Sequence, residues 1–83
     1  LTLDAVARGV GMSPFHFCRV FRALVGLPPH RYLRRVRLER AAARLRAGAG
    51  VTDTCHATGF NNLGHFVRAF REAYGVPPGR FRG

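Results

Sequence analysis

The sequence predicts an all-α fold made of two similar helical units. The first observation is an internal repeat: "HFCRVFRALVGLPPHRY" at 16–32 matches "HFVRAFREAYGVPPGRF" at 65–81 in nine of 17 positions, at an offset of 49. The second is that apolar residues recur at helical spacing, with no convincing strand pattern. The third is that a short helical segment and a glycine turn precede each copy. A short helix, a tight turn and a longer helix make a helix-turn-helix.

The first unit opens with a short helix that we expect over residues 2–9, with Thr2 as its cap. A turn follows at 10–12. Ser13 and Pro14 then predict a strong helix start, because a hydroxyl can cap the first free N–H groups and proline suits the first helical position. A long helix is therefore expected to begin here.

Glycines and proline pairs predict where the longer helices end. The helix that starts at Ser13 should stop at Gly26, a typical C-terminal signal, with a proline pair just beyond it. A linker helix is expected over 29–47, and the glycine-rich segment 48–50 should break it. These boundaries predict three parts: residues 1–28 as the first helix-turn-helix, 29–47 as the linker helix, and 51–83 as the second helix-turn-helix.

The second unit repeats these signals. Thr52 is expected to cap a short helix that runs to about Thr58, and Gly59 turns the chain. Asn61 is expected to cap the last long helix, which should close at Gly75 before a second proline pair. Small residues precede both glycine turns by four positions, and they should let the helices of each unit cross closely: Ala7 before Gly11, and Cys55 before Gly59.

The two longer helices each divide into a buried stripe and an outward face. At i, i+3, i+4 and i+7 spacing, the buried stripes should be Phe17, Val20, Phe21 and Leu24 in the first helix and Phe66, Ala69, Phe70 and Ala73 in the second. The outward faces combine arginine with apolar or small groups: Phe15, Cys18, Arg19 and Arg22 in the first, and Leu63, Gly64, Val67, Arg68 and Arg71 in the second. Arginine for guanine and apolar groups for the thymine methyl are what a major-groove reader needs.

An alternative remains open for those faces. An outward arginine is usually just solvated, and Phe15 or Leu63 could cover the edge of the core. The structure can decide this, because a residue that covers the core is itself largely buried.

Charge is the most informative part of the composition. Fourteen arginines and no lysine face four acidic residues, giving a net charge of +10 and a pI near 11.7. A pI this high is typical of nucleic-acid binding. A solvated basic surface, or one that meets an acidic protein or lipid, is the alternative. No apolar run is long enough for a membrane span.

The sequence offers no candidate for catalysis, metal or cofactor. Cys18 and Cys55 form no disulfide framework and no zinc-ligand spacing, and no nucleophile–base–acid set is present. The cysteine usage suits a reducing cytoplasm. We therefore predict a non-enzymatic protein without cofactor.

The linker helix sets an expected spacing. About 18 residues at 1.5 Å each span roughly 27 Å, and readers of successive major grooves on one face of DNA stand about 34 Å apart. With the width of the flanking helices added, one chain can serve two adjacent half-sites. Several linker arginines should then flank the DNA backbone: Arg31, Arg34, Arg35, Arg37, Arg40, Arg44 and Arg46.

The chain resembles the DNA-binding domain of the AraC/XylS family of bacterial transcription regulators. The resemblance is strongest in "GFNNLGHFVRAFREAYGVPPGRFR" (59–82) and also clear in "GMSPFHFCRVFRALVGLPPHRYLRRVRLERA" (11–41). It implies two homeodomain-like units that bind promoter DNA sequence-specifically. Carried over by position, base contacts fall on Phe15, Cys18, Arg19, Leu63, Gly64, Val67 and Arg68.

Phosphate contacts are expected from polar and basic residues beside these positions: Ser13, His16, Arg22, Arg31, Arg35, Asn61, His65, Arg71 and Arg80. The family usually has polar residues where Leu63 and Gly64 stand, so the second copy should grip phosphates more than it reads bases. It usually has a bulky apolar residue at Thr54, so the second unit should be looser.

The resemblance also implies partners beyond DNA. RNA polymerase and an effector-binding domain of the same full-length protein are expected. Related domains usually carry one more helix before the position of Leu1. The absence of that helix would leave part of the core of the first unit uncovered. Two other functions stay open: a module that docks an acidic protein through the basic linker, and a non-specific nucleoid-type binder.

Overall fold

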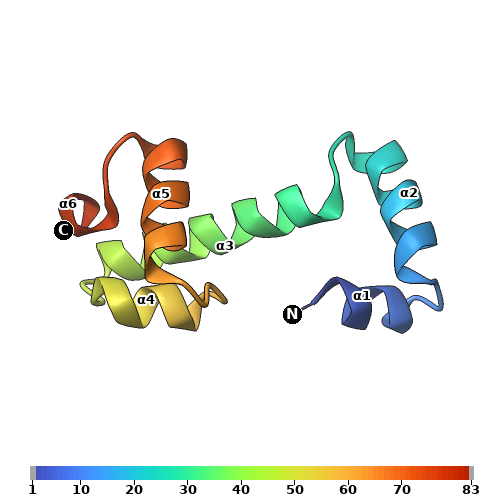
Figure 1. Ribbon diagram of the computed structural model, residues 1–83, viewed down its shortest axis with the longest axis horizontal. Coiled ribbons are helices and arrows are strands. Elements are labelled where there is room, and N and C mark those ends of the chain that lie inside the picture. Colours follow the sequence, from blue (N-terminus) through green and yellow to red (C-terminus); the bar gives the residue numbers. More distant parts are fainter. Residues whose placement is uncertain (1, 83) are drawn as a thin grey trace. The chain divides into compact units, whose positions relative to one another are not determined.

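The computed structural model describes residues 2–82, which form six helices and contain no strand. The all-helical fold and the two helix-turn-helix arrangements are confirmed (Figure 1). The sixth helix was missed, although proline at its first position is a recognised start signal. The helices are α1 (Leu3–Gly9), α2 (Pro14–Val25), α3 (Pro29–Arg46), α4 (Val51–Ala57), α5 (Leu63–Tyr74) and α6 (Pro78–Phe81).

The described chain divides into two compact units at a boundary inside α3. The N-terminal unit runs to Arg34 and holds α1, α2 and the start of α3. The C-terminal unit begins at Arg35 and holds the rest of α3 with α4, α5 and α6. In each unit a short helix is followed by a turn and a longer helix, α1 before α2 and α4 before α5 (Figure 1).

Side-chain caps set the starts of the first two helices as expected. The Thr2 hydroxyl accepts a hydrogen bond from the Ala5 N–H at 3.2 Å, and the Ser13 hydroxyl accepts one from the His16 N–H at 3.2 Å. Both cap residues have extended backbones, which lets their oxygens reach forward over the first turn. Pro14 occupies the first helical position of α2.

Two predicted caps in the second unit were wrong. The α5 cap is Asn62 and not Asn61: its carboxamide oxygen accepts from the His65 N–H at 2.8 Å. Thr52 lies inside α4, whose cap is Gly50, without a side-chain hydrogen bond. The repeat explains the first error, because α5 follows α2 at an offset of 49 whereas the glycine turns are 48 apart. The second turn is therefore one residue longer.

Both turns use glycine in a left-handed conformation, with φ of 72° at Gly11 and 91° at Gly59. Each turn also closes with the same hydrogen bond back to the short helix. The Met12 N–H donates to the Ala7 carbonyl at 2.9 Å, and the Phe60 N–H donates to the Cys55 carbonyl at 3.0 Å. Ala7 and Cys55 are fully buried, which agrees with the close helix crossing expected there.

The main hydrophobic core belongs to the C-terminal unit. Aromatic rings run through it: Phe66 lies 5.0 Å from Phe60 and 5.9 Å from Phe70, measured between ring centroids. Apolar residues on the α3 side complete the core. Because the cluster joins α3, α4 and α5, the second helix-turn-helix is anchored on the linker helix. Its buried members are Leu38, Ala41, Ala42, Leu45, Cys55, Phe60, Phe66, Ala69 and Phe70.

The N-terminal unit buries much less. No residue of α2 is fully buried, and Phe17, Val20 and Phe21 are half-buried. The predicted stripes were wrong at their last members, because Leu24 is 82% exposed and Ala73 is exposed too. Helical spacing determines which residues share a face, but it does not determine how far the neighbouring helices extend along that face.

The short α6 closes the C-terminal unit. The Phe81 ring lies 5.1 Å from the Phe70 ring, and the Arg46 guanidinium lies 5.0 Å from the Phe81 centroid. Arg82 donates two hydrogen bonds to the Gly48 carbonyl, at 2.7 and 3.1 Å. Arg46, which was predicted to flank the DNA backbone, therefore also contacts Phe81 within the fold.

Candidate nucleic-acid interface

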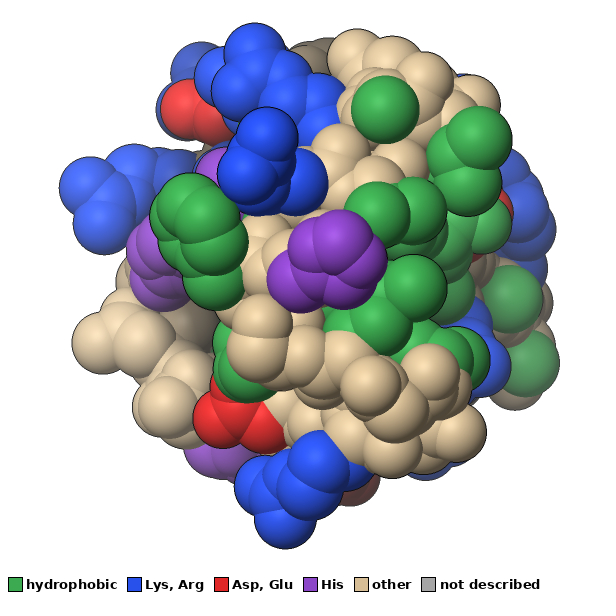
Figure 2. Space-filling view, turned by 90° about the vertical axis from the view of Figure 1, so that its right-hand side faces the viewer, with side chains coloured by type: hydrophobic (Ala, Val, Ile, Leu, Met, Phe, Trp, Pro, Cys, Tyr) green, Lys and Arg blue, Asp and Glu red, His purple; other side chains and the backbone are tan. Residues whose placement is uncertain are grey.

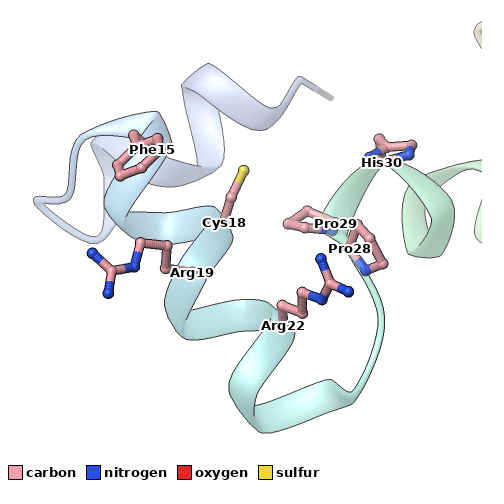
Figure 3. A pocket seen from close by; sticks show the side chains of 7 residues that line it. All are labelled: Phe15, Cys18, Arg19, Arg22, Pro28, Pro29 and His30. Atoms are coloured by element: carbon pink, nitrogen blue, oxygen red, sulfur yellow. The ribbon is translucent and has the colours of Figure 1, made fainter.

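The outward face of α2 lines a groove in the N-terminal unit. Phe15 is 74% exposed, so the alternative that it covers the edge of the core is wrong. Arg19 and Arg22 are exposed as well, and Cys18 is half-buried. The groove has a volume of about 210 Å³ and is lined by Phe15, Cys18, Arg19, Arg22, Pro28, Pro29 and His30 (Figure 3).

The side chains of this groove point in two directions. Cys18 and Arg22 face Pro28 and the first two residues of α3, Pro29 and His30 (Figure 3). Phe15 and Arg19 project from the other side of α2 in that view. The Arg19 guanidinium carbon lies 6.0 Å from the Phe15 ring centroid, at the outer limit of a cation–π contact. An arginine and an aromatic ring thus stand together on the exposed face.

The outward face of α5 differs in composition. Leu63 is 42% exposed, Gly64 and Arg68 are exposed, and Val67 is half-buried. A β-carbon added at Gly64 would lie 3.4 Å from the Asn62 carboxamide oxygen and otherwise in open space. The fold therefore tolerates alanine at this position, so packing does not require the glycine.

A wide, open hollow accompanies this second face. It has a volume of about 520 Å³ and is lined by Asn61, Asn62, His65 and Arg68. The Asn62 oxygen is occupied by the cap, which leaves its amide N–H groups as donors. The hollow therefore presents amide and guanidinium donors, a set suited to phosphate oxygens.

The remaining predicted phosphate ligands all lie at the surface. Ser13 and His16 are exposed at the start of α2, although the Ser13 hydroxyl already accepts the capping bond. The exposed Arg35 pairs with Glu39 at 3.5 Å. Such a solvated pair is worth little and can yield to a phosphate. The others are also exposed: Arg31, Arg71 and Arg80.

The structure adds groups that the sequence prediction missed. Pro28, Pro29 and His30 form one wall of the first groove, and Asn62 joins the second hollow. The repeated proline pair was a signal for the first set, because a rigid segment after each long helix places the next side chains reproducibly.

Basic and apolar side chains mix on the N-terminal unit. Figure 2 looks onto the α1–α2 end of the chain and shows arginine, histidine and hydrophobic groups beside one another, with little acidic surface. α2 itself contains no acidic residue. Helix α2 therefore presents positive electrostatic potential and apolar side chains together, a combination suited to binding a polyanion.

The two cysteines differ in environment. Cys55 is buried, and its thiol donates to the Phe60 carbonyl at 3.4 Å. Burial raises the pKa of the Cys55 thiol, since the thiolate would lose its hydration. Within residues 2–82 no three His, Cys, Asp or Glu side chains gather as metal ligands. No helix of the described part is long and apolar enough to cross a membrane.

Comparison with known proteins places this geometry in a family. A family model for a helix-turn-helix domain matches residues 6–83. A solved regulator from Chromobacterium violaceum with an AraC-type DNA-binding domain has a TM-score of 0.86 and 29% identity, covering 99% of this chain and 74% of that one. The chain belongs to the AraC/XylS family.

Two further relatives bear on this AraC-type domain. The transcriptional activator RhaS of Escherichia coli is 41% identical over 64 residues, which are 76% of this chain and 23% of RhaS. The DNA-binding domain of AdpA, solved in complex with a target DNA, has a TM-score of 0.88 and 26% identity, covering 99% of this chain and 75% of that one. The AraC-type domain spans less than a quarter of RhaS.

Proposed function

We propose that this domain binds double-stranded promoter DNA sequence-specifically and thereby regulates bacterial transcription. In the proposal α2 and α5 enter successive major grooves. The observation that carries it is the likeness to the AdpA domain, which was solved bound to its target DNA. The exposed aromatic and arginine pair on α2 supports it, because neither group is needed for the core.

The two faces have different proposed roles. Arg19 and Arg68 are the base readers, since a guanidinium can donate two hydrogen bonds to guanine O6 and N7. Cys18 and Val67 add apolar contact beside them, with Phe15 and Leu63 for thymine methyl groups. Phosphate contacts come from the exposed polar and basic groups: Ser13, His16, Arg22, Arg31, Arg35, Asn61, His65, Arg71 and Arg80.

Partners beyond DNA follow from the same proposal. RhaS is named as a transcriptional activator, and we propose that the protein that carries this domain likewise contacts RNA polymerase. The matched region is 23% of RhaS, so we propose that an effector-binding domain accompanies this one in the full-length protein. Such a regulator acts in the bacterial cytoplasm.

Selection of duplexes from a random pool, followed by fluorescence anisotropy, tests the function. We expect a selected site to bind tighter than random duplex by a factor of about 10³ or more. The logarithm of the binding constant should fall with the logarithm of salt concentration, with a slope near −0.9 for each phosphate contacted. Equal affinity for both duplexes would indicate a nucleoid-type binder, and no duplex binding would indicate a protein-docking module.

Matched arginine variants separate base contact from phosphate contact on α2. Arg19→Ala should cost roughly 1–3 kcal/mol on the selected site and relax preference at one base pair. Arg22→Ala, on the same helix, should weaken selected and random duplexes alike and make the salt slope shallower by about one. An equal loss on both duplexes for Arg19→Ala contradicts its assigned role.

A further inference from the structure

We infer that Phe15 positions Arg19, so that the two side chains together read a guanine with a thymine at the adjacent base pair. The second copy lacks this device, and base discrimination is therefore concentrated in the α2 unit. This inference rests on the proposed function, because it concerns how the same DNA interface discriminates between bases.

The first step is the exposure of Phe15. A phenylalanine that is 74% exposed in the first turn of a helix gains little from burial within its own unit. Its neighbour one helical turn later is Arg19, because residues i and i+4 lie on one face. The guanidinium carbon stands 6.0 Å from the ring centroid, and both side chains project from the same side of α2 (Figure 3).

The second step is what the ring does to the arginine. An exposed arginine samples many rotamers, and fixing one of them for a bidentate contact costs side-chain entropy. A ring within cation–π range reduces that freedom before DNA binds. Phe15 is therefore a positioning residue for Arg19, and its other exposed edge remains available to a thymine methyl in the major groove.

The third step is the comparison inside the chain. The repeat places Gly64 at the position of Phe15 and Arg68 at the position of Arg19, each at an offset of 49. Gly64 has no side chain to restrain Arg68, which lines an open hollow with three polar residues. The two readers thus carry the same arginine, and only the first has a ring at the supporting position.

The experiment compares preferences and not affinities alone. With a selected site and the folded chain, the preference for guanine over other bases at the contacted position is measured for wild type, Phe15→Leu, Arg19→Ala and the double variant. Phe15→Leu should lower the guanine preference by about 5-fold or more while it keeps an apolar side chain. In the Arg19→Ala background the same change should have no further effect on that preference.

Base analogues and the reciprocal variant complete the test. Replacing the adjacent thymine with deoxyuridine removes only the methyl group. This replacement should lower the DNA affinity of the wild type more than it lowers the affinity of the Phe15→Gly variant. Gly64→Phe should increase the guanine preference at the position that Arg68 reads. Leu24→Ala, which changes another highly exposed apolar residue of α2, should leave the guanine preference unchanged.

Two outcomes overturn the inference. Additive effects of Phe15→Leu and Arg19→Ala would show that the two residues act separately. A loss that is equal on selected and random duplexes would show that Phe15 contributes only general contact. If no duplex is preferred at all, the proposed function fails too, and this is visible in wild type before any variant is compared.

Discussion

At the scale of single residues, Thr54 departs from what its position requires. The residue is fully buried, and its hydroxyl has no hydrogen-bond partner among the described residues. A buried polar group without a partner costs free energy that a methyl group at the same place does not. The cost expected in the second unit is therefore local to Thr54, because the C-terminal unit still holds the larger hydrophobic core.

Thr54→Val should increase the free energy of unfolding by about 1–2 kcal/mol, because it removes the unpaired hydroxyl and keeps the shape. Urea denaturation followed by far-UV circular dichroism measures this change.

Thr58→Val is the matched control, since the Thr58 hydroxyl donates to the Thr54 carbonyl at 2.7 Å. The same chemical change should there lower stability by about 0.5–1.5 kcal/mol. If both variants shift stability in the same direction, the account of Thr54 is wrong.

The cysteines give a second prediction at this scale. Cys18 is half-buried and lines an open groove, whereas Cys55 is buried with a raised pKa. A disulfide reagent such as DTNB at pH 8 should label one thiol quickly and the second far more slowly, because the thiolate is the reactive form. Cys18→Ser should abolish the fast phase, and retention of that phase would contradict the assignment.

Burial of Cys55 also affects stability at alkaline pH. Its folded pKa is raised, so the stability that it contributes is present at neutral pH and is lost as pH rises through the ordinary thiol range and beyond. Cys55→Ala should therefore lose less stability between pH 8 and pH 10 than wild type does. A parallel decline of the two proteins would exclude this cause.

At the scale of elements, the two glycine turns look alike but differ in what lies above them. Both glycines have positive φ, yet only at Gly59 does an added β-carbon meet a neighbour, the Arg37 Nε at 3.0 Å. Around Gly11 the space is empty to 4 Å. The linker helix therefore rests against the second turn through Arg37.

Gly11→Ala should cost about 1–2 kcal/mol from backbone conformation alone. Gly59→Ala should cost more, because the Arg37 side chain must also move. The free energies of unfolding from urea denaturation of the two variants test this order. If the two variants lose the same free energy of unfolding, the Arg37 side chain can move away from the added methyl group without an energetic penalty.

The element boundaries show how far sequence reasoning reaches. Ser13, Pro14 and Gly26 carry local signals, and the structure confirms each of them. Asn61 and Asn62 carry the same signal, so local chemistry alone could not choose between them. The repeat could have chosen, because α2 and α5 are offset by the same 49 residues as Ser13 and Asn62.

Other features of the site needed coordinates. The sequence presents fourteen equivalent arginines, and only tertiary contacts reveal that Arg46 stacks on Phe81 or that Arg82 binds the Gly48 carbonyl. The stripes failed at Leu24 and Ala73 for a related reason, since helical spacing does not report where a packing partner ends. The outward faces could be predicted because they depend on that spacing alone.

At the scale of the whole molecule, burial is divided unequally. The C-terminal unit holds the described cluster of buried aromatic and aliphatic residues, whereas α2 has no fully buried residue. Local stability follows buried apolar contact. We therefore expect the unit that carries α5 to have a higher local stability than the unit that carries α2, the other helix proposed to read DNA.

Amide hydrogen exchange should show this difference directly. Amides in the middle of α5, such as that of Phe70, should exchange more slowly than those in the middle of α2, such as that of Phe21, in the free chain. Bound DNA should slow exchange in α2 more than in α5, because α2 has more protection to gain. Equal protection of the two helices in the free chain would contradict the unequal cores.

The final helical turn has a practical consequence for anyone who shortens the protein. A version cut before Pro78 would lose the Phe81 ring that packs on Phe70 and on the Arg46 guanidinium. It would also lose the hydrogen bonds from Arg82 to the Gly48 carbonyl. Helix α5 would then pack against an incomplete core. Weak DNA binding by such a fragment would therefore reflect a destabilised C-terminal unit and not the loss of a direct DNA contact.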